Sequence, residues 1–219
     1  MSTNIDAGLL DQQTTTRDAF LGGRVFVSQP VGGFRAGLDS VLLAASLGKH
    51  STSIVELGAG AASICALADL SGATATLLDI DPAMLDLATG NLAANSLSGR
   101  ANTVCLDVTA RGSELFAGGL KRDYYDSVIA NPPFFATGSG SLSPDKARAN
   151  ARHMPAQDLD LWLRSAATLG APGAEVIFIH LAQALPQLLA SFSSRFGAIT
   201  VLPVIARPFG NATRVLVRG

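Results

Sequence analysis

The segment that decides the fold reads Ile54-Val55-Glu56-Leu57-Gly58-Ala59-Gly60-Ala61-Ala62-Ser63. It begins with a short, mostly apolar run typical of a buried strand and continues into a turn of glycine and alanine. After the turn, Ile64, Leu67 and Ala68 recur at helical spacing. The segment therefore predicts a β-strand, a sharp turn and an α-helix. Glycines in such a turn allow the backbone to bend tightly and to approach a bound molecule, toward which the first helical turn presents unpaired N–H groups.

A second predicted strand, Ala75–Ile80, carries Asp79 near its end. A carboxylate at this place, about 20 residues after a glycine turn, can accept hydrogen bonds from both hydroxyls of a ribose. The two features together predict a site for a cofactor that contains ribose. A dinucleotide is one alternative, because Ser63 would fit as the third small residue of its fingerprint. A tight turn without a ligand is the other. Asp81, which precedes Pro82, is interpreted as a helix cap.

The rest of the chain alternates between strand-like and helix-like segments. This alternation predicts an α/β fold of the Rossmann-like kind, with a seven-stranded, mostly parallel sheet covered by helices on both faces. The last two strands are close in sequence and predict a C-terminal hairpin that supplies an antiparallel strand. Beyond the two strands already named, we expect strands at Val104–Leu106, Ser127–Ala130, Glu175–His180, Ile199–Ile205 and Thr213–Val217.

The domain organisation follows from where this alternation starts. Residues 51–219 are expected to form the α/β domain. Residues 1–50 are expected to form an N-terminal extension, with a hairpin around Val25–Val27 and a helix that begins near Leu38 and ends before Gly48. A Gly/Ser-rich stretch, Thr137–Ser143, is the best candidate for a mobile loop.

Composition restricts the class of protein. With 219 residues, 48% of them hydrophobic and 15% charged, the chain can bury a substantial core in one main domain. Its 16 basic and 17 acidic residues do not indicate general affinity for nucleic acid. Apolar runs end before the roughly 20 residues of a membrane span, and a secretory signal is absent from the N-terminus, so a cytoplasmic location is expected. Cys65 and Cys105 are expected to be reduced core residues, and the histidines and cysteines lack metal-ligand spacing.

The strongest local signal is Asn131-Pro132-Pro133-Phe134, directly after the fourth strand of the predicted sheet. The lone pair of an amide or exocyclic amino nitrogen is delocalised, so a site that alkylates such a nitrogen must hold its N–H groups and aim the lone pair. The Asn131 side-chain oxygen and the carbonyl of the next residue offer two acceptors, fixed by two prolines, and Phe134 can stack on a planar substrate. A rigid Asn-Pro turn at a strand end is the structural alternative.

Taken together, these motifs resemble the class I S-adenosylmethionine-dependent methyltransferases with an Asn-Pro-Pro-Phe motif, most closely the tRNA adenine-N6 methyltransferases of the tRNA1(Val) adenine-37 type. The resemblance begins at residues 33–44, runs through the motifs above and ends in residues 207–218. It implies a methyltransferase domain with S-adenosylmethionine as cofactor. It departs from the family at Ala61-Ala62, where a further glycine is common.

The resemblance also implies a role for individual residues. The residues implied to bind the donor are Glu56, Gly58, Ala59, Gly60, Asp79, Ile80, Asp107, Val108 and Asn131, with Asp39 over the methionine end or, equally, as a helix cap. The residues implied to carry the reaction are Asn131, Pro132, Pro133 and Phe134, of which Asn131 orients the amino group and Phe134 stacks on the acceptor.

The acceptor is less tightly defined than the reaction. Adenine N6 in tRNA is favoured, because Lys146, Arg148, Arg152, Arg207 and Arg214, with Arg218 at the chain end, could form a local basic patch for phosphates. An ordinary set of solvated charges is the alternative. Methylation of a protein glutamine at N5, methylation of another RNA such as rRNA, and a non-catalytic nucleotide-cofactor-binding module remain open. His153 is interpreted as structural.

Overall fold

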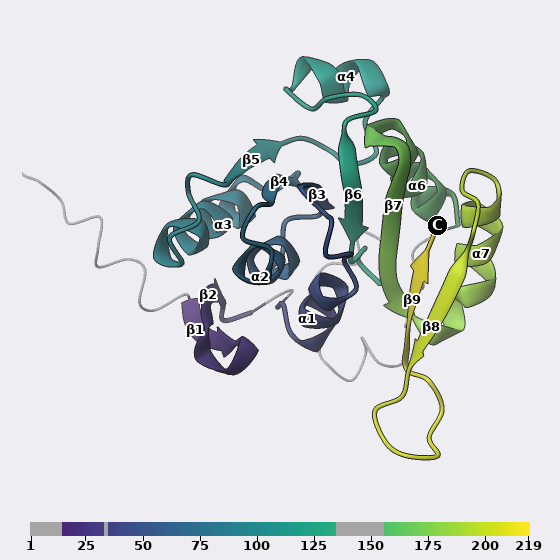
Figure 1. Cartoon of the computed structure of the whole chain (residues 1–219), viewed down its shortest axis with the longest axis horizontal. Helices are drawn as coiled ribbons and strands as arrows, with labels where there is room; N and C mark the ends of the chain where they lie inside the picture. The colour runs from purple at the N-terminus through teal and green to yellow at the C-terminus, as the bar shows by residue number, and fades with distance from the viewer. Residues whose placement is uncertain (1–14, 33–34, 135–155) are drawn as a thin grey trace, which may run out of the picture.

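One seven-stranded sheet forms the centre of the molecule (Figure 1), seen in a computed structural model that describes residues 15–32, 35–134 and 156–219. Its strands are β3 (Ser53–Leu57), β4 (Thr74–Asp79), β5 (Ala101–Cys105), β6 (Tyr125–Ala130), β7 (Gly170–Leu181), β8 (Thr200–Val204) and β9 (Arg214–Arg218). They lie in the order β5-β4-β3-β6-β7-β9-β8, and β9 runs antiparallel to both of its neighbours. The predicted fold class and the C-terminal antiparallel hairpin are confirmed.

Helices cover both faces of this sheet. The first face is covered by α1 (Leu38–Ala45), α2 (Ala62–Asp69) and α3 (Pro82–Ala94), and the second by α6 (Ala156–Leu169) and α7 (Leu185–Ser193), with α4 (Gly112–Ala117) adding Leu115 to the second core. Each layer of helices encloses its own hydrophobic core against the sheet. Successive residues of β3 point to opposite faces, so Ile54 packs in the first core and Val55 in the second. A central strand must therefore be apolar on both sides. None of the described helices is long and apolar enough to cross a membrane.

The start of α3 follows the predicted capping pattern. The Asp81 carboxylate accepts a hydrogen bond from the backbone N–H of Ala83 at 2.9 Å, and Pro82 occupies the first turn. α1 begins differently, since Gly37 is its N-cap and makes no side-chain capping bond. Asp39 lies in the first turn of α1 and is not the cap.

The N-terminal hairpin, β1 (Thr15–Phe20) and β2 (Val25–Pro30), forms a separate two-stranded antiparallel sheet, as the glycine-flanked sequence predicts. Two asparagines, one in α3 and one at its C-cap, attach it to the domain. The Asn91 side chain accepts from Ser28 N at 2.7 Å and donates to Ser28 O at 2.9 Å. The Asn95 side chain makes the same pair of bonds with Phe26, at 3.0 and 2.7 Å. The two amides are one helical turn apart and bond alternate residues of β2, as a neighbouring strand would.

The two cysteines differ in their surroundings. Cys65 of α2 is buried, and its thiol has a pKa raised to about 12. Burial is the main cause of the raised pKa, and the negative charges of Glu56 and Asp69 add to it. Cys105 is exposed, so the prediction that it is a core residue is wrong. It closes β5, which lies at the edge of the sheet, where a strand has a neighbour on one side only.

A hydrogen-bonded carboxylate joins β3 to β6 where the two strands begin. Asp126 accepts from Thr52 N at 2.8 Å, Thr52 Oγ1 at 2.6 Å and Ser53 N at 3.0 Å. Burial acts to raise the pKa of Asp126, but the hydrogen bonds from Thr52, Ser127 and Ser53 outweigh it and hold the pKa below its ordinary value of 3.8. The ionised form therefore stabilises the fold.

We expect Asp126→Asn to lower the melting temperature at pH 7 by about 2–4 °C, the shift that follows from losing roughly 1 kcal/mol in a domain of this size. Because the folded-state pKa is lowered, the carboxylate stabilises the fold above the pKa of the unfolded chain. This stabilisation is lost as the pH falls through the folded-state pKa. Melting curves from pH 7 down to about pH 3 should show the gap to wild type closing. Asp86→Asn, at an exposed position of α3, is the control, and a gap that stayed constant with pH would contradict the assignment.

Candidate functional site

Four neighbouring parallel strands have their carboxyl ends along one edge of the sheet, and the predicted site residues lie at or just after these ends. In the order β5-β4-β3-β6, Asp107 comes shortly after β5, Asp79 closes β4, Gly58 follows β3 and Asn131 follows β6. Leu57 pairs with Leu78 on one side and with Ala130 on the other. Gly58 and Asn131 are therefore next to each other across adjacent strands, which in a sheet lie about 4.8 Å apart.

The turn after β3, residues 58–61, is called the glycine loop below. Gly58 has a φ of +78°, in the left-handed region that glycine adopts without strain. A Cβ on Gly58 would also lie 3.1 Å from the Trp162 ring of α6. The Gly58 N–H donates to Leu78 O at 2.8 Å, which ties the loop to β4. Both the backbone conformation and the space around this position therefore require glycine.

Glu56 shapes the glycine loop from within. Its carboxylate is buried and accepts from Ser63 N at 2.8 Å, Gly60 N at 3.2 Å and Ala62 N at 3.3 Å. Burial raises the pKa of Glu56, and the hydrogen bonds from Ser63, Ala62 and Gly60 act against that rise. A Cβ on Gly60 would lie 3.1 Å from Glu56 Oε1, so the second glycine makes room for this carboxylate. Glu56 thus satisfies the N–H groups at the start of α2.

Asp79 lies beside the glycine loop, at the end of β4. Its carboxylate is half-buried and accepts from Asp81 N at 2.9 Å. Burial raises its pKa; hydrogen bonds from the backbone N–H groups of Asp81, Ala59 and Ile80 oppose the rise, and the charge of Asp81 adds to it. The bond from Gly58 N to Leu78 O places the next residue of β4, Asp79, beside the loop. Ile80, the next residue, is 65% exposed and offers an apolar surface at the same edge.

The β5 end supplies Asp107 and Val108. The Leu106 N–H donates to Asp79 O at 2.9 Å, which brings this turn next to the β4 end. The Asp107 carboxylate accepts from the backbone and the hydroxyl of Thr109, both at 2.7 Å, and so holds its own turn. Val108 is buried, and its carbonyl accepts from Ser165 of α6. The turn is thus fixed on both sides.

The Asn131–Phe134 motif begins where β6 ends. Pro132 is buried, Pro133 is exposed and Phe134 is half-buried. The Asn131 Oδ1 atom is buried and has no hydrogen-bond partner within residues 15–32, 35–134 and 156–219. A buried acceptor without a donor is unfavourable in a folded protein, and such an atom calls for an explanation.

Phe134 is held by residues from distant parts of the chain. The guanidinium of Arg214, on β9, lies 4.9 Å from the ring centroid, and the buried His180 of β7 packs edge-on at 5.0 Å. Arg214 Nε in turn donates to Asp39 Oδ2 of α1 at 2.9 Å. The sequence gives no sign of these contacts, because Asp39 and Arg214 are 175 residues apart. We call Asp39, Arg214, Phe134 and His180 the Phe134 cluster.

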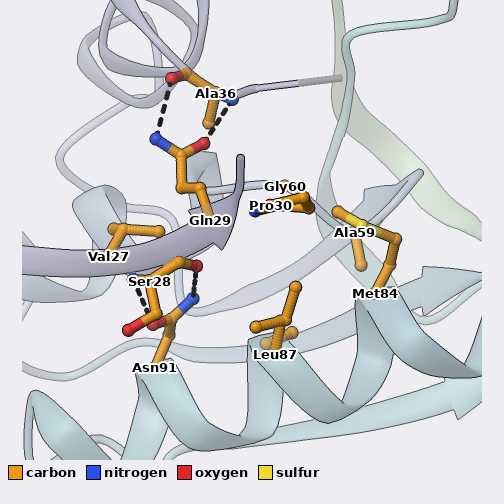
Figure 2. A pocket seen from close by; sticks show the side chains of 11 residues that line it. Val27, Ser28, Gln29, Pro30, Ala36, Ala59, Gly60, Met84, Leu87 and Asn91 are labelled. Carbon is orange, nitrogen blue, oxygen red and sulfur yellow. Dashed lines mark hydrogen bonds between the residues drawn. The ribbon is translucent and has the colours of Figure 1, made fainter. Parts of the chain in front are cut away.

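The N-terminal hairpin forms a wall beside the glycine loop. Figure 2 shows a small pocket lined by Val27, Ser28, Gln29 and Pro30 of β2, by Ala59 and Gly60 of the loop, and by Met84, Leu87 and Asn91 of α3. Gln29 fixes the chain before α1, since its side chain accepts from Ala36 N at 2.6 Å and donates to Ala36 O at 3.2 Å. Sequence patterns do not identify Gln29 and Asn91. The partners of Gln29 are Ala36 and Asp18, and the partner of Asn91 is Ser28, 63 residues away.

The predicted basic patch is only partly visible. Lys146, Arg148, Arg152 and His153 lie outside the described residues. Arg207 is exposed, and Arg214 belongs to the Phe134 cluster. Arg218 lies at the other end of β9, where it pairs with Glu175 at 3.4 Å and donates to Ser46 O. The structure therefore separates Arg218 from Arg207 and Arg214.

Comparisons with known proteins agree on the kind of domain. The family described as "Methyltransferase small domain" matches residues 34–161. A "tRNA1(Val) (adenine(37)-N6)-methyltransferase" from Shewanella amazonensis is 31% identical over 123 residues, which cover 55% of this chain and 49% of the relative. The protein of the same name from Shewanella halifaxensis is 29% identical over 165 residues, covering 74% of this chain and 64% of the relative. The chain thus spans about half to two thirds of these relatives.

A solved structure has the same fold. It is a "predicted O-methyltransferase" from Agrobacterium tumefaciens, 27% identical, with a TM-score of 0.67, and the match covers 82% of this chain and 79% of that one.

We expect Gly58→Ala to destabilise the protein by about 1–2 kcal/mol, because alanine is strained at positive φ and its Cβ would press on Trp162. Gly90→Ala is the matched control. Gly90 lies in α3 with open space around its Cα, so alanine there should stabilise by up to about 1 kcal/mol through helix propensity. Urea denaturation of both variants measures the difference. A Gly58→Ala protein as stable as wild type would show that the turn tolerates a side chain.

Proposed function

This chain belongs to the methyltransferase small domain family, whose members use S-adenosylmethionine, and we propose that it methylates an exocyclic amino nitrogen, with adenine N6 of a tRNA as the favoured acceptor. Residues 51–219 would form the catalytic domain and residues 1–50 an extension, whose strand β2 would border the donor site. A tRNA acceptor agrees with the cytoplasmic location that the sequence predicts.

The residues at the sheet edge fit the donor. The glycine loop brings backbone close to a ligand at the start of α2, where a side chain at Gly58 is excluded. The half-buried carboxylate of Asp79 lies against this loop and suits the hydroxyls of a ribose. Ile80 directly follows Asp79, and Asp107 and Val108 come after the end of β5. These three residues would flank the adenine. Glu56 would act indirectly, by holding the loop backbone.

The observation that carries the proposal is the buried Oδ1 of Asn131 beside the glycine loop, an acceptor for which the described part of the chain supplies no donor. S-adenosylmethionine supplies an electrophilic methyl group on its sulfonium sulfur. The Asn131 oxygen and the Pro132 carbonyl would accept hydrogen bonds from the two N–H groups of an amino nitrogen, which favours a pyramidal nitrogen and frees its lone pair from conjugation. As the new C–N bond forms, the methyl C–S bond would break and S-adenosylhomocysteine would leave. One amino proton would then pass to solvent, so positioning rather than a strong base would drive the reaction.

The Phe134 cluster supports a planar acceptor. The Arg214 guanidinium and the His180 ring both contact the ring of Phe134, and Asp39 pairs with Arg214. A ring fixed in this way is prepared to stack on a base or on an amide. Asp39 would thus support the acceptor side of the site through Arg214.

The choice of acceptor rests on the relatives. Two of them are named as adenine-N6 methyltransferases of tRNA1(Val), whereas the structural neighbour is named as a predicted O-methyltransferase. Two acceptors at Asn131 and Pro132 suit a nitrogen that carries two protons better than a hydroxyl that carries one. Glutamine N5 of a protein carries the same two protons and is the second candidate acceptor.

The deciding experiment incubates the protein with methyl-labelled S-adenosylmethionine and, separately, with tRNA, rRNA and protein fractions from cells that lack it. We expect label in tRNA, recovered as N6-methyladenosine by mass spectrometry of nucleosides. Asn131→Ala should lower turnover by on the order of 100-fold or more and leave the affinity for S-adenosylhomocysteine nearly unchanged. Label in protein alone would replace adenine by glutamine, and full activity of Asn131→Ala would remove Asn131 from the reaction.

The donor assignment is tested by two neighbouring acids. Asp79→Ala should weaken S-adenosylhomocysteine binding about 10- to 100-fold, because hydrogen bonds from ribose to a carboxylate are lost. Asp81→Ala should leave that affinity unchanged and lower stability by about 1 kcal/mol, since Asp81 caps α3. Calorimetric titration and thermal melting measure both effects. Equal donor affinity in the two variants would exclude Asp79 from the donor site.

A further inference from the structure

The connection between β8 and β9, residues 205–213, contains a tight turn. The connection lies at the same end of the sheet as the candidate site. The turn is closed by a hydrogen bond from Gly210 N to Arg207 O at 3.0 Å. Because β9 is antiparallel to both β7 and β8, β8 runs in the same direction as β3 and β6. The loop after β8 therefore projects from the edge at which the glycine loop and Asn131 lie (Figure 1).

Phe209 in this turn is an unusual residue for its position. Its exposed fraction is 108%, so the ring gains nothing from packing, and its φ of +63° lies in the region that glycine favours. A bulky side chain at positive φ is strained, and a fully exposed ring adds no stability to the fold. Both observations indicate that the ring serves a contact outside the chain.

The surroundings of Phe209 are basic. The ten residues from Ile205 to Arg214 include two arginines and no acid, although the whole chain has a formal net charge of −1. Arg207 is exposed and forms no ion pair with the residues that the structure describes. The loop rejoins the sheet at Arg214, whose guanidinium lies over Phe134. A ligand bound at the turn is therefore at the end of the sheet that carries the proposed acceptor site.

We propose that the turn from Arg207 to Gly210 docks an unpaired RNA nucleotide, with the Phe209 ring stacked on its base and Arg207 at its phosphate. The inference rests on the proposed function, because it assumes an RNA acceptor. Stacking on an exposed ring beside a guanidinium is a general way of holding single-stranded nucleic acid. A protein partner fits less well, because the turn flanks Phe209 with Pro208, Gly210 and Arg207 instead of a continuous apolar patch.

The test measures binding of two fluorescein-labelled RNAs of equal length by anisotropy: a hairpin with a loop of about seven unpaired bases and a blunt duplex. Phe209→Leu should weaken binding of the hairpin about 10-fold, while Phe209→Trp, which keeps a stacking ring, should bind like wild type. Tyr124→Leu is the control, since Tyr124 is an exposed aromatic residue just before β6, at the opposite edge of the sheet. Neither Phe209 variant should change S-adenosylhomocysteine affinity.

The phosphate contact has its own readout. Arg207→Gln should reduce the slope of log Kd against log salt concentration by about 0.7, the value for one phosphate contact to a single strand. An unchanged slope would contradict the role given to Arg207.

Failure of the inference and failure of the proposed function give different results. If wild type methylates RNA and Phe209→Leu binds the hairpin and transfers methyl groups as wild type does, the docking site is wrong and the proposed function stands. If Phe209→Leu instead lowers only transfer to the protein fraction, the turn contacts protein and the inference is wrong. If wild type transfers nothing to RNA, the proposed acceptor is wrong whatever Phe209 does.

Discussion

The parallel pairing of β3 with β6 is the constraint on which the candidate site depends. It places Leu57 opposite Ala130, so the residues that follow, Gly58 and Asn131, emerge side by side at one edge of the sheet. The same strand pairs with β4 on its other side, which adds Asp79. Neither the glycine loop nor Asn131 makes a site alone. The register of these strands would join the proposed donor site to the proposed acceptor site, and ligands of open α/β sheets commonly bind at such strand ends.

The shape of the glycine loop depends on a buried carboxylate. A buried carboxylate is unfavourable in itself, and Glu56 is tolerated because three backbone N–H groups point at it. Those N–H groups would otherwise be unpaired at the start of α2. The two glycines have different roles. Gly58 adopts a positive φ and leaves room for the Trp162 ring, whereas Gly60 leaves room for the Glu56 carboxylate. The loop is thus fixed before any ligand is bound.

The N-terminal hairpin and strand β9 both reach the site across long sequence separations. The N-terminal hairpin is attached to α3 through Asn91 and Asn95 and lines the pocket next to Gly60. From the other end, Arg214 of β9 joins Asp39 to Phe134. The hairpin therefore borders the glycine loop, and β9 borders Phe134.

The sequence by itself determined the elements and the motifs, because these depend on local patterns. Apolar runs, the glycine turn, the Asp81-Pro82 cap and Asn131–Phe134 are each readable within a few residues, and together they predicted the sheet, its antiparallel hairpin and the order of the site loops. Only the tertiary structure decided which groups meet. In the structure, the Glu56 carboxylate points into the glycine loop and Asp39 pairs with Arg214. Arg218 lies at the end of β9 away from the site, and Cys105 is exposed on β5, the outermost strand of the sheet. The physical reason is that burial and pairing depend on strand order and direction, which bring together residues more than a hundred positions apart and leave no periodic trace in the chain.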